Sequence, residues 1–376
     1  MPWQWPWRPQ TQDRDLFNIG SLVVPGTAAG EPVTVDSAMR VNTVFACVRL
    51  ISDAVSTLPV HVYRAGDRDP IPTPPLLQRP AADFPELSDW LWAVMSSLLL
   101  RGNAWGRITA RAGAGLLPAQ VDLVHPDHVT VNVSDGQAPE FRIGPDVVDR
   151  DDLWHVKAFT FPGSLLGLSP IAYARETLGL GLAAEKFGAR FFADSAIPSG
   201  YLHSDQRVDE TTAKHVKAVW QAAHKGRRDT AVLGGVKYVP VSIAPEEAQF
   251  IETQKLNAAG ICRLYGIPGG MMAGVELAGH EDYSSPEQRA TDLLTWTIRP
   301  WLHRLERAIS TLLPSTQTVK FNPGAYLRPT LRERYEAHRL GIEAGWLLPS
   351  EVRALEDLPP VPGIDDRARP TGGAVA

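Results

Sequence analysis

The stretch SPIAYARETLGLGLAAEKFGARFFAD, residues 169–194, does most to decide the predicted fold. Ser169 is a good N-cap and Pro170 suits the first helical position, so the sequence predicts a helix that continues to about Asp194. Three glycines lie inside it, at Gly179, Gly181 and Gly188. Each costs about 1 kcal/mol relative to alanine, so helix stability does not account for them. Such small residues let a neighbouring element approach closely, either within one subunit or between subunits.

A second long helix is predicted from about Pro245 to Tyr265 and ends at Gly266. Glu246 and Glu247 lie in its first turn, where the helix dipole favours acidic residues. Between the two helices, residues 195–244 have the pattern of a strand, a polar helix and another strand. The order is therefore helix, small α/β insertion, helix.

The next helix begins after a loop that is rich in glycine and contains methionine. Ser285-Pro286-Glu287-Gln288 combines an N-cap, a proline at the first position and a glutamine at the third, as in a capping box. The helix is predicted to reach about Leu313 and to pass through Pro300. Proline there clashes with the carbonyl of Trp296, so we expect a kink between Trp296 and Pro300.

The first half of the chain has a different sequence pattern, in which helical segments are followed by strand-like segments. Apolar residues recur at helical spacing from Val44 to Leu58, and a second helix is predicted from about Glu86 to Leu100. Short strand-like runs separated by Gly, Pro and Asp then follow to residue 158, so residues 40–160 are expected to form one α+β domain. The first forty or so residues are rich in Pro, Gly and Trp. They are read either as an arm that orders only against another surface or as a simple tail.

Composition limits the classes of function. The chain has 376 residues, enough for two or three domains, with 44% hydrophobic and 21% charged residues. The formal net charge is −5, so the chain lacks the overall positive charge of proteins that bind nucleic acid tightly. Any contact with DNA must therefore be local or weak. Cys47 and Cys262 are expected to be buried thiols and not a disulfide. No secretory signal or membrane span is recognised, which indicates a protein made in the cytosol without a membrane partner.

No motif for catalysis, cofactor binding or metal binding stands out. The phosphate-binding loops of nucleotide hydrolases are absent from the sequence. His125 and His128 flank a Pro-Asp turn without a third ligand nearby, so a metal site is not expected there. Five basic residues do cluster, at Lys214, Lys217, Lys225, Arg227 and Arg228. They form either a solvated helix face or a surface for an acidic partner.

Several segments resemble the portal proteins of tailed bacteriophages, HK97 type, from about residue 37 to residue 363. The segments are Asn42–Ile51 with Leu58–Val60, Leu100–Trp105, Gly167–Pro170, Arg190–Ala193, Pro198–Gly200, Tyr265–Pro268, Ile298–Trp301 and Glu351–Arg353. Their order and spacing carry the resemblance, because no single segment is specific.

The resemblance implies a portal fold with an α/β wing, a two-helix stem, a small α/β clip and a long kinked helix. The implied parts are an N-terminal arm (1–36), wing (37–168), first stem helix (169–194), clip (195–244), second stem helix (245–266), tunnel loop (267–284), kinked wing helix with a short crown (285–358) and a flexible tail (359–376). Ile267-Pro268-Gly269-Gly270 departs from the family, which often has a second proline there, so the tunnel-loop conformation is not implied.

The implied function is an oligomeric ring, usually a dodecamer, at one capsid vertex. It would be assembled in the host cytoplasm and would reside in the virion. It would pass double-stranded DNA without sequence specificity and would bind the major capsid protein, the large terminase and head-completion proteins. A mildly acidic channel would let DNA slide, because each neutralised phosphate adds affinity. The alternatives are another head-tail adaptor protein or an uncharacterised enzyme.

The resemblance also places two groups of site residues. The basic cluster would lie on the clip and meet its partners. The loop between stem and kinked helix would place a second group near the channel: Met271, Met272, Glu276, His280 and Glu281.

Overall fold

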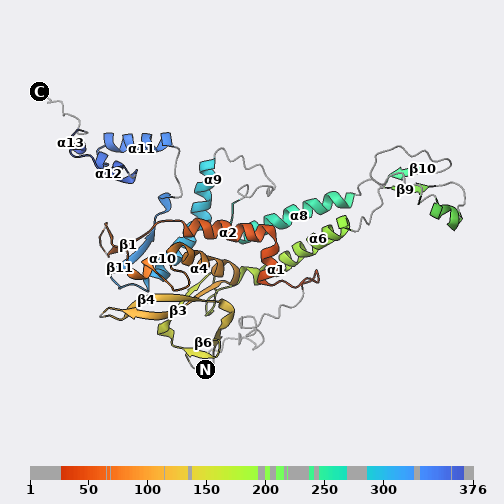
Figure 1. Cartoon of the computed structure of the whole chain (residues 1–376), viewed down its shortest axis with the longest axis horizontal. Coiled ribbons are helices and arrows are strands. Elements are labelled where there is room, and N and C mark those ends of the chain that lie inside the picture. Colours follow the sequence, from red (N-terminus) through yellow and green to blue (C-terminus); the bar gives the residue numbers. More distant parts are fainter. Residues whose placement is uncertain are drawn as a thin grey trace, which may run out of the picture.

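The computed structural model describes most of the chain from Thr27 onward. The described residues are 27–64, 66–67, 69–113, 115–133, 138–193, 200–203, 209–215, 218, 237–240, 245–268, 286–325, 331–356 and 358–367. Figure 1 shows a body with small sheets, two long helices that extend from it, and a group of short helices near the C-terminus. Helices combined with small antiparallel sheets confirm the predicted α+β class.

The helical layer of the body is built on α2 (Asn42–Ser56) and α4 (Leu87–Arg101), which pack against each other. Apolar residues recur every three or four positions on α2, and Val44, Cys47 and Ile51 are fully buried. Both ends of α2 lie two residues before the bounds expected from the apolar pattern, and both ends of α4 lie one residue after the expected bounds. The sequence pattern therefore predicts this layer well.

The sheets of the body are antiparallel and have the strand orders β11-β1-β2, β4-β3-β8 and β5-β6-β7. The strands run over Val60–Arg64 (β1), Pro70–Ile71 (β2), Asn103–Ala112 (β3), Leu117–Val124 (β4), Val129–Asn132 (β5), Glu140–Ile143 (β6), Asp146–Val148 (β7), Leu153–Lys157 (β8) and Gln317–Phe321 (β11). Short helical turns connect them, at Pro75–Gln78 (α3), Pro126–His128 (η3), Arg150–Asp152 (η4) and Pro323–Ala325 (η6). Because β1 pairs with β11, the second half of the chain completes a sheet that the first half begins.

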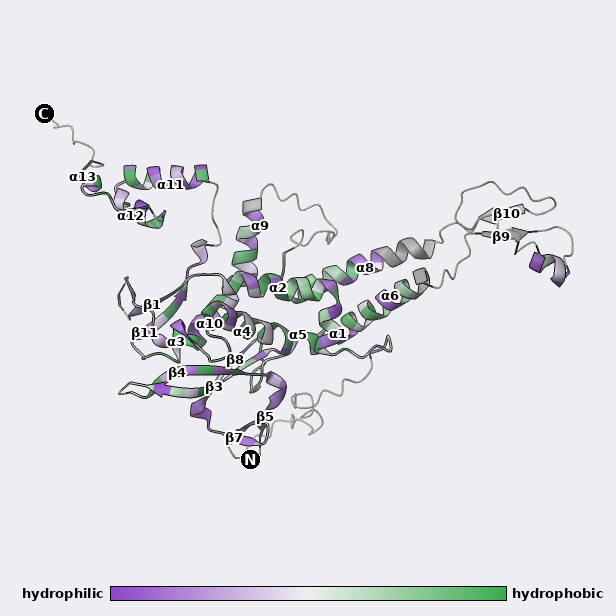
Figure 2. Cartoon of the chain, in the orientation of Figure 1, coloured by the Kyte–Doolittle hydropathy of each residue, from purple (hydrophilic) through white to green (hydrophobic). Residues whose placement is uncertain are grey.

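One large apolar core joins the helices to two of these sheets. Trp90 of α4 contacts Trp154 of β8, with ring centroids 5.0 Å apart. The indole N–H of Trp154 donates to the carbonyl oxygen of Ala308, at 2.9 Å. A smaller core around Trp105 and Phe141 lies under the β5-β6-β7 sheet. Figure 2 shows apolar residues along α2 and on the part of α8 next to it.

The two long helices are α6 (Arg175–Ala193) and α8 (Pro245–Leu264), which pack side by side. The first predicted helix is correct in extent but is divided, because α5 (Pro170–Tyr173) ends at Ala174 before α6 begins. A two-stranded sheet of β9 (Gly200–His203) and β10 (Lys237–Pro240) lies beyond their far ends (Figure 1). The predicted helix–insertion–helix order is therefore present.

The glycines of α6 accommodate neighbours within the same chain. A Cβ atom on Gly179 would lie 2.5 Å from the Thr27 hydroxyl oxygen, and one on Gly181 would lie 2.3 Å from the side-chain nitrogen of Asn257 on α8. For these two positions, the structure favours packing within one subunit over packing between subunits.

The segment from Thr27 to Asp36 corrects the expected extent of the N-terminal arm. Val33 is 2% exposed and Thr27 is 5% exposed, so this segment packs against the body and does not behave as a free arm. Thr34 caps α1 (Val35–Arg40) through a capping box with Ser37. The sequence did not predict this packing, because prolines and glycines are irregularly spaced in the segment. Its burial also depends on contacts with α6, which lies far away in the sequence.

The predicted long helix after Ser285 consists of three pieces. They are α9 (Pro286–Asp292), a π-helical segment η5 (Leu293–Ile298) and α10 (Arg299–Ser310). The Arg299 N–H bonds to the Leu294 carbonyl, five residues back, and Pro300 has no N–H to offer. Trp296, one of the two residues between which a kink was predicted, lies in this π-helical segment, and Pro300 follows it at the start of α10. The C-terminal helices are α11 (Leu331–Glu343), α12 (Pro349–Leu355) and α13 (Ile364–Arg367). Helices α12 and α13 were not expected.

Candidate functional site at the base of the two long helices

The first long helix is joined to the body through Asn103, a polar side chain that is 3% exposed. Its Nδ2 atom donates to the Gly167 carbonyl oxygen at 2.9 Å, and its Oδ1 atom accepts from the Gly167 N–H at 2.7 Å. Nδ2 also donates to the Arg101 carbonyl oxygen at 3.2 Å. Because buried polar groups require partners, these bonds hold the loop before α5 against the start of β3.

Two glycines make this contact sterically possible. A Cβ atom on Gly102 would lie 2.1 Å from the Leu168 carbonyl oxygen, and one on Gly167 would lie 2.1 Å from the Gly102 carbonyl oxygen. Both obstacles are backbone atoms, so neither can rotate away. Gly102 also has a φ of 74°, a left-handed conformation that suits glycine.

Ser169 adds a further bond to the same junction. Its hydroxyl donates to the Leu100 carbonyl oxygen at 2.9 Å and also caps α5 by accepting from the Ala172 N–H. Two segments singled out in the sequence, residues 100–105 and residues 167–170, therefore meet here. We call residues 100–105, 155 and 167–170 the stem-base junction.

His155 takes part in the stem-base junction as a neutral donor. Its Nε2 atom lies 3.0 Å from Asn103 Oδ1, and its ring stacks on Trp105 with centroids 3.5 Å apart. Burial lowers the pKa of His155 to about 3, and the charges of Lys157 and Arg150 act in the same direction. Since an amide oxygen only accepts hydrogen bonds, the neutral ring must carry its proton on Nε2.

The second long helix ends in a fixed turn. The Ile267 N–H bonds to the Cys262 carbonyl, and the Gly266 N–H bonds to the Arg263 carbonyl. With Gly266 at a φ of 70°, this is a Schellman motif. The buried Thr297 hydroxyl donates to the Gly266 carbonyl, so the end of α8 is held against the π-helical segment η5.

Two thiols and a phenol lie together where α8 crosses α2. Cys47 and Cys262 are both buried and free, which confirms the expected buried thiols. The hydrogen bond with Cys262 and burial raise the pKa of Cys47 well above its usual range. Burial likewise raises the pKa of Tyr265. The Cys47 thiol and the Tyr265 phenol are therefore protonated at neutral pH. The hydrogen bond with Cys47 lowers the pKa of the Cys262 thiol.

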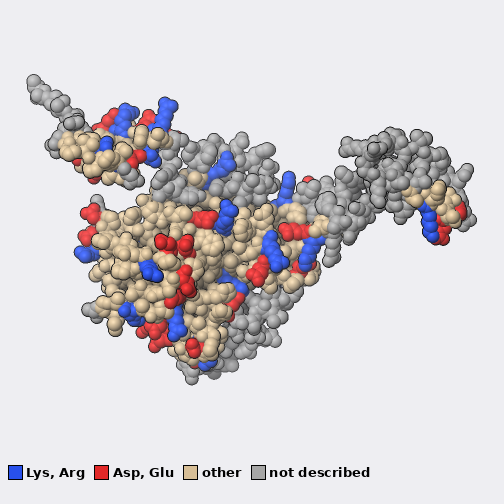
Figure 3. All heavy atoms as spheres, in the orientation of Figure 1, with Lys and Arg blue, Asp and Glu red and all other residues tan. Residues whose placement is uncertain are grey.

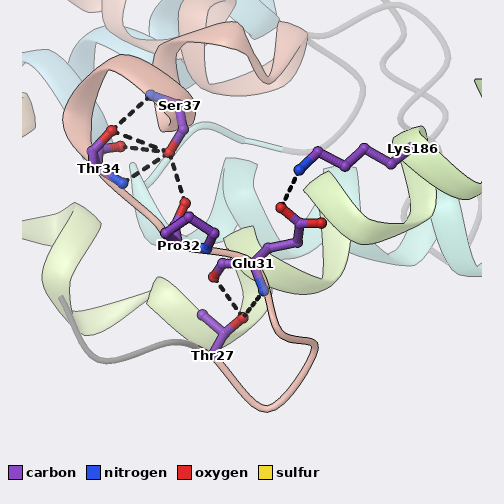
Figure 4. A network of polar contacts seen from close by, with 6 residues as sticks. All are labelled: Thr27, Glu31, Pro32, Thr34, Ser37 and Lys186. Carbon is purple, nitrogen blue, oxygen red and sulfur yellow. Dashed lines mark hydrogen bonds and ion pairs between the residues drawn. The ribbon is translucent and has the colours of Figure 1, made fainter.

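A short segment that we call the strap, residues 27–34, lies along α6 (Figure 4). Thr27 and Glu31 bond to each other, because the Thr27 hydroxyl donates to the Glu31 carbonyl and accepts from its N–H. The Glu31 carboxylate pairs with Lys186 of α6. The Ala28 N–H donates to the Glu176 carboxylate at 3.0 Å. The strap is therefore attached to the first long helix at several points, and sequence periodicity gave no signal for it.

The predicted site residues fall mostly outside the described part of the chain. Met271, Met272, Glu276, His280 and Glu281 all lie outside it, as do Lys217, Lys225, Arg227 and Arg228. Lys214 is described, is exposed, and pairs with Glu210 at 2.7 Å. Among the residues predicted to lie at the kink, Trp296 is 73% exposed, and Pro300 begins α10 together with Arg299.

The histidine pair in the His-Pro-Asp-His turn has another use. The Asp127 carboxylate pairs with Arg101, and the rings of His125 and His128 lie 5.4 Å apart. In the described part of the chain, three or more potential metal ligands do not come together anywhere. The same part has no helix with the length and apolar character needed to cross a bilayer. In Figure 3, basic and acidic residues are interspersed over the visible face, without a large patch of one sign.

Exposed apolar residues on the first long helix were not predicted from the sequence. Leu180 is 48% exposed and Phe187 is 61% exposed, both on α6, and Tyr173 at the end of the separate helix α5 is 62% exposed. The seven-residue spacing of Leu180 and Phe187 places these two on one face of α6, as in a helix seam. On α8, Leu256 is 66% exposed. The heptad spacing was visible in the sequence, but only the structure shows that these positions of α6 are exposed.

Comparison with known proteins identifies the family. The family profile described as "Phage portal protein" matches residues 42–357. The chain belongs to the phage portal protein family. A probable portal protein of Streptomyces phage phiC31 is 32% identical over 96% of this chain and 83% of its own length. The portal protein of Enterobacteria phage HK97 is 26% identical over 93% of this chain and 87% of its own length. The portal resemblance drawn from the sequence is confirmed.

Solved structures share the portal fold. A chain in the neck of an empty gene transfer agent (GTA) particle computed with C6 symmetry has a TM-score of 0.64 and 23% identity, covering 88% of this chain and 95% of that one. An HK97 family phage portal protein from Corynebacterium diphtheriae has a TM-score of 0.52 and 18% identity, covering 79% of this chain and 98% of that one. The expected portal fold, with its helix–insertion–helix order, is confirmed.

Proposed function

We propose that the chain is the ring subunit of a phage portal, assembled at one capsid vertex, through which double-stranded DNA passes during packaging and ejection. The two long helices α6 and α8 would form the stem, and the β9-β10 sheet with its flanking residues would form the clip. Membership of the portal family supports a structural role for the chain. The observation that carries the proposal is the pair of long helices that projects from the body, with exposed apolar side chains at Leu180 and Phe187 of α6.

The exposed apolar side chains of α6 support assembly into a closed ring. In a ring, each subunit offers two different faces to its neighbours, so these side chains can meet a second surface on the next subunit. Leu256, on α8, is a suitable member of that second surface because it is 66% exposed. A related chain comes from the neck of a native GTA particle computed with C12 symmetry, which supports a dodecamer.

DNA passage and partner binding complete the proposal. The net charge of −5 suits a channel in which DNA slides, because few phosphate contacts means little affinity. Met271, Met272, Glu276, His280 and Glu281 would lie near this channel. The basic cluster around Lys214 would meet the large terminase or a head-completion protein, and the body would meet the major capsid protein. Because Lys214 pairs with Glu210, the positive charge for this contact would come from the other basic residues of the cluster.

Ring assembly is tested by negative-stain imaging with particle mass measured in parallel. The unchanged chain should give rings with an axial hole and a mass near that of twelve subunits. Leu180→Glu should give mostly unassembled subunits, because a carboxylate would be buried in the contact. Leu117→Glu, a matched change at a leucine that is 37% exposed on β4, should leave rings intact. Intact rings with Leu180→Glu would remove this face of α6 from the interface, and monomers of the unchanged chain would argue against the proposal.

A further inference from the structure

The strand β8 has a free edge. It is the last strand of the β4-β3-β8 sheet, and the Ala158 N–H bonds to the Gly102 carbonyl on the β3 side. Hydrogen bonding alternates along an antiparallel strand, so the N–H and C=O groups of His155 and Lys157 point away from β3. Within the described part of the chain, no hydrogen bond reaches these outward groups. Two donors and two acceptors therefore face outward at regular spacing.

A basic groove runs beside this edge. Its volume is about 450 Å³, and its walls are the segment from His155 to Thr160 and one face of α10. Four of the lining side chains can carry a positive charge, at Lys157, His303, Arg304 and Arg307, and none of the lining residues is acidic. We call this pocket the β8 groove.

The cations of the β8 groove have no acidic partner among the described residues. Ion pairs form nearby, as between Lys320 and Glu306, but none includes Lys157, Arg304 or Arg307. The Arg304 guanidinium lies over the Trp301 ring, 4.9 Å from its centroid. Burial lowers the pKa of Arg304, so pairing with an arriving carboxylate would offset the cost of desolvating this charge.

We infer that the β8 groove binds an extended acidic segment of a partner protein, which adds a strand to β8 and places carboxylates against Arg304 and Arg307. Strand addition uses the outward backbone groups of His155 and Lys157 for affinity. Alternate side chains of the added strand point to one side, where the basic face of α10 lies. The chemistry therefore selects an acidic residue at every second position.

A peptide fits this site better than nucleic acid does. The outward edge offers donors and acceptors in alternation, which an extended peptide matches group for group. A phosphate backbone would accept from the arginines and from N–H groups, but it would leave the carbonyls of His155 and Lys157 without donors. The inference therefore does not depend on the DNA channel of the proposed function.

The test measures binding of a labelled octapeptide that alternates glutamate with threonine. Fluorescence anisotropy is recorded with the full-length protein, and a matched peptide with lysine in place of glutamate is the control. The glutamate peptide should bind and the lysine peptide should not. Arg304→Gln and Arg307→Gln should each weaken binding about fivefold, because a partly exposed ion pair contributes on this scale. Arg299→Gln, on the same helix but outside the groove, should leave binding unchanged.

Lys157→Pro separates strand addition from simple charge attraction. Proline is tolerated at an edge position whose N–H points outward, and it removes one of the backbone donors. Lys157→Gln removes only the charge, so Lys157→Pro should weaken binding beyond Lys157→Gln. Equal effects would show that the peptide is held by charge alone and would overturn strand addition.

Competition with duplex DNA and particle mass complete the test. Tighter binding of duplex DNA, lost with Arg304→Gln and unaffected by Lys157→Pro, would make the groove a phosphate site and overturn the inference. A change in particle mass with Arg304→Gln would assign the groove to a second copy of the chain and would also overturn it. Failure of the glutamate peptide to bind, with intact rings, would reject the inference while leaving the portal function in place.

Discussion

Replacing Asn103 by alanine should destabilise the body more than any surface change, because this side chain makes four hydrogen bonds at the stem-base junction. The change leaves two buried donors without acceptors, the Gly167 N–H and the Nε2–H of His155. An unsatisfied buried donor costs about 1 to 3 kcal/mol. The two carbonyls lose less, since a carbonyl oxygen has a second lone pair. We expect a loss of about 3 to 4 kcal/mol, after allowing for a water molecule that enters the space.

The assay is equilibrium unfolding in urea, followed by tryptophan fluorescence, because Trp105 stacks on His155 inside the junction. It is done on unassembled chains, since ring formation would add stability by mass action. With a urea slope of about 3 kcal/mol/M, the midpoint should fall by about 1 M. Asn132→Ala is the matched control, because this exposed asparagine bonds only to Glu140. A midpoint shift for Asn103→Ala as small as that of the control would refute the junction argument.

Three further changes test other features. Gly179→Ala should release the strap and speed its proteolysis. Gly181→Ala should have less effect, because the added Cβ atom would meet only the end of a flexible side chain. Equal proteolysis rates for the two variants would contradict this. His155 has a folded pKa of about 3, below the unfolded value of about 6.5, so its contribution to stability is complete above about pH 6.5 and falls by up to about 1.4 kcal/mol per unit as pH drops toward 3. His155→Phe should therefore lose less stability than the unchanged chain between pH 7 and 5, measured by urea midpoints, and parallel losses would count against a neutral histidine. Glu356→Gln should speed trypsin cleavage among the C-terminal helices, since its buried carboxylate pairs with two basic side chains, while Glu343→Gln should not; identical digestion patterns would rule this out.

Periodicity and capping predicted the helices well. The apolar spacing of α2, the Ser169-Pro170 start and the proline at position 300 each have a local cause, so each could be read without knowledge of the fold. The π-helical segment could not be predicted from local patterns, and its residues Leu293 and Thr297 are buried in the structure. Pro300 therefore indicated where the helix is irregular, but not that the irregular part is a π-helical segment.

The contacts that build the site were harder to predict. Asn103 lies 64 residues from its partner Gly167, and only a resemblance grouped their segments together. The strap was assigned to a flexible arm because its burial depends on α6, 148 residues further along in the case of Ala28 and Glu176. The free edge of β8 requires the strand order, which local patterns do not contain.

The bond between Thr297 and the Gly266 carbonyl has a consequence for how the family can vary. This bond holds together the two ends of the chain between Gly266 and Thr297. The entropy cost of bringing those ends together is therefore offset by contacts outside the intervening segment. Doubling the length of a flexible loop then costs only about 0.6 kcal/mol. Segments of different length and chemistry can therefore be exchanged between Ile267 and Ser285 without redesigning the helices that support them. An engineer could use this position to insert new sequences.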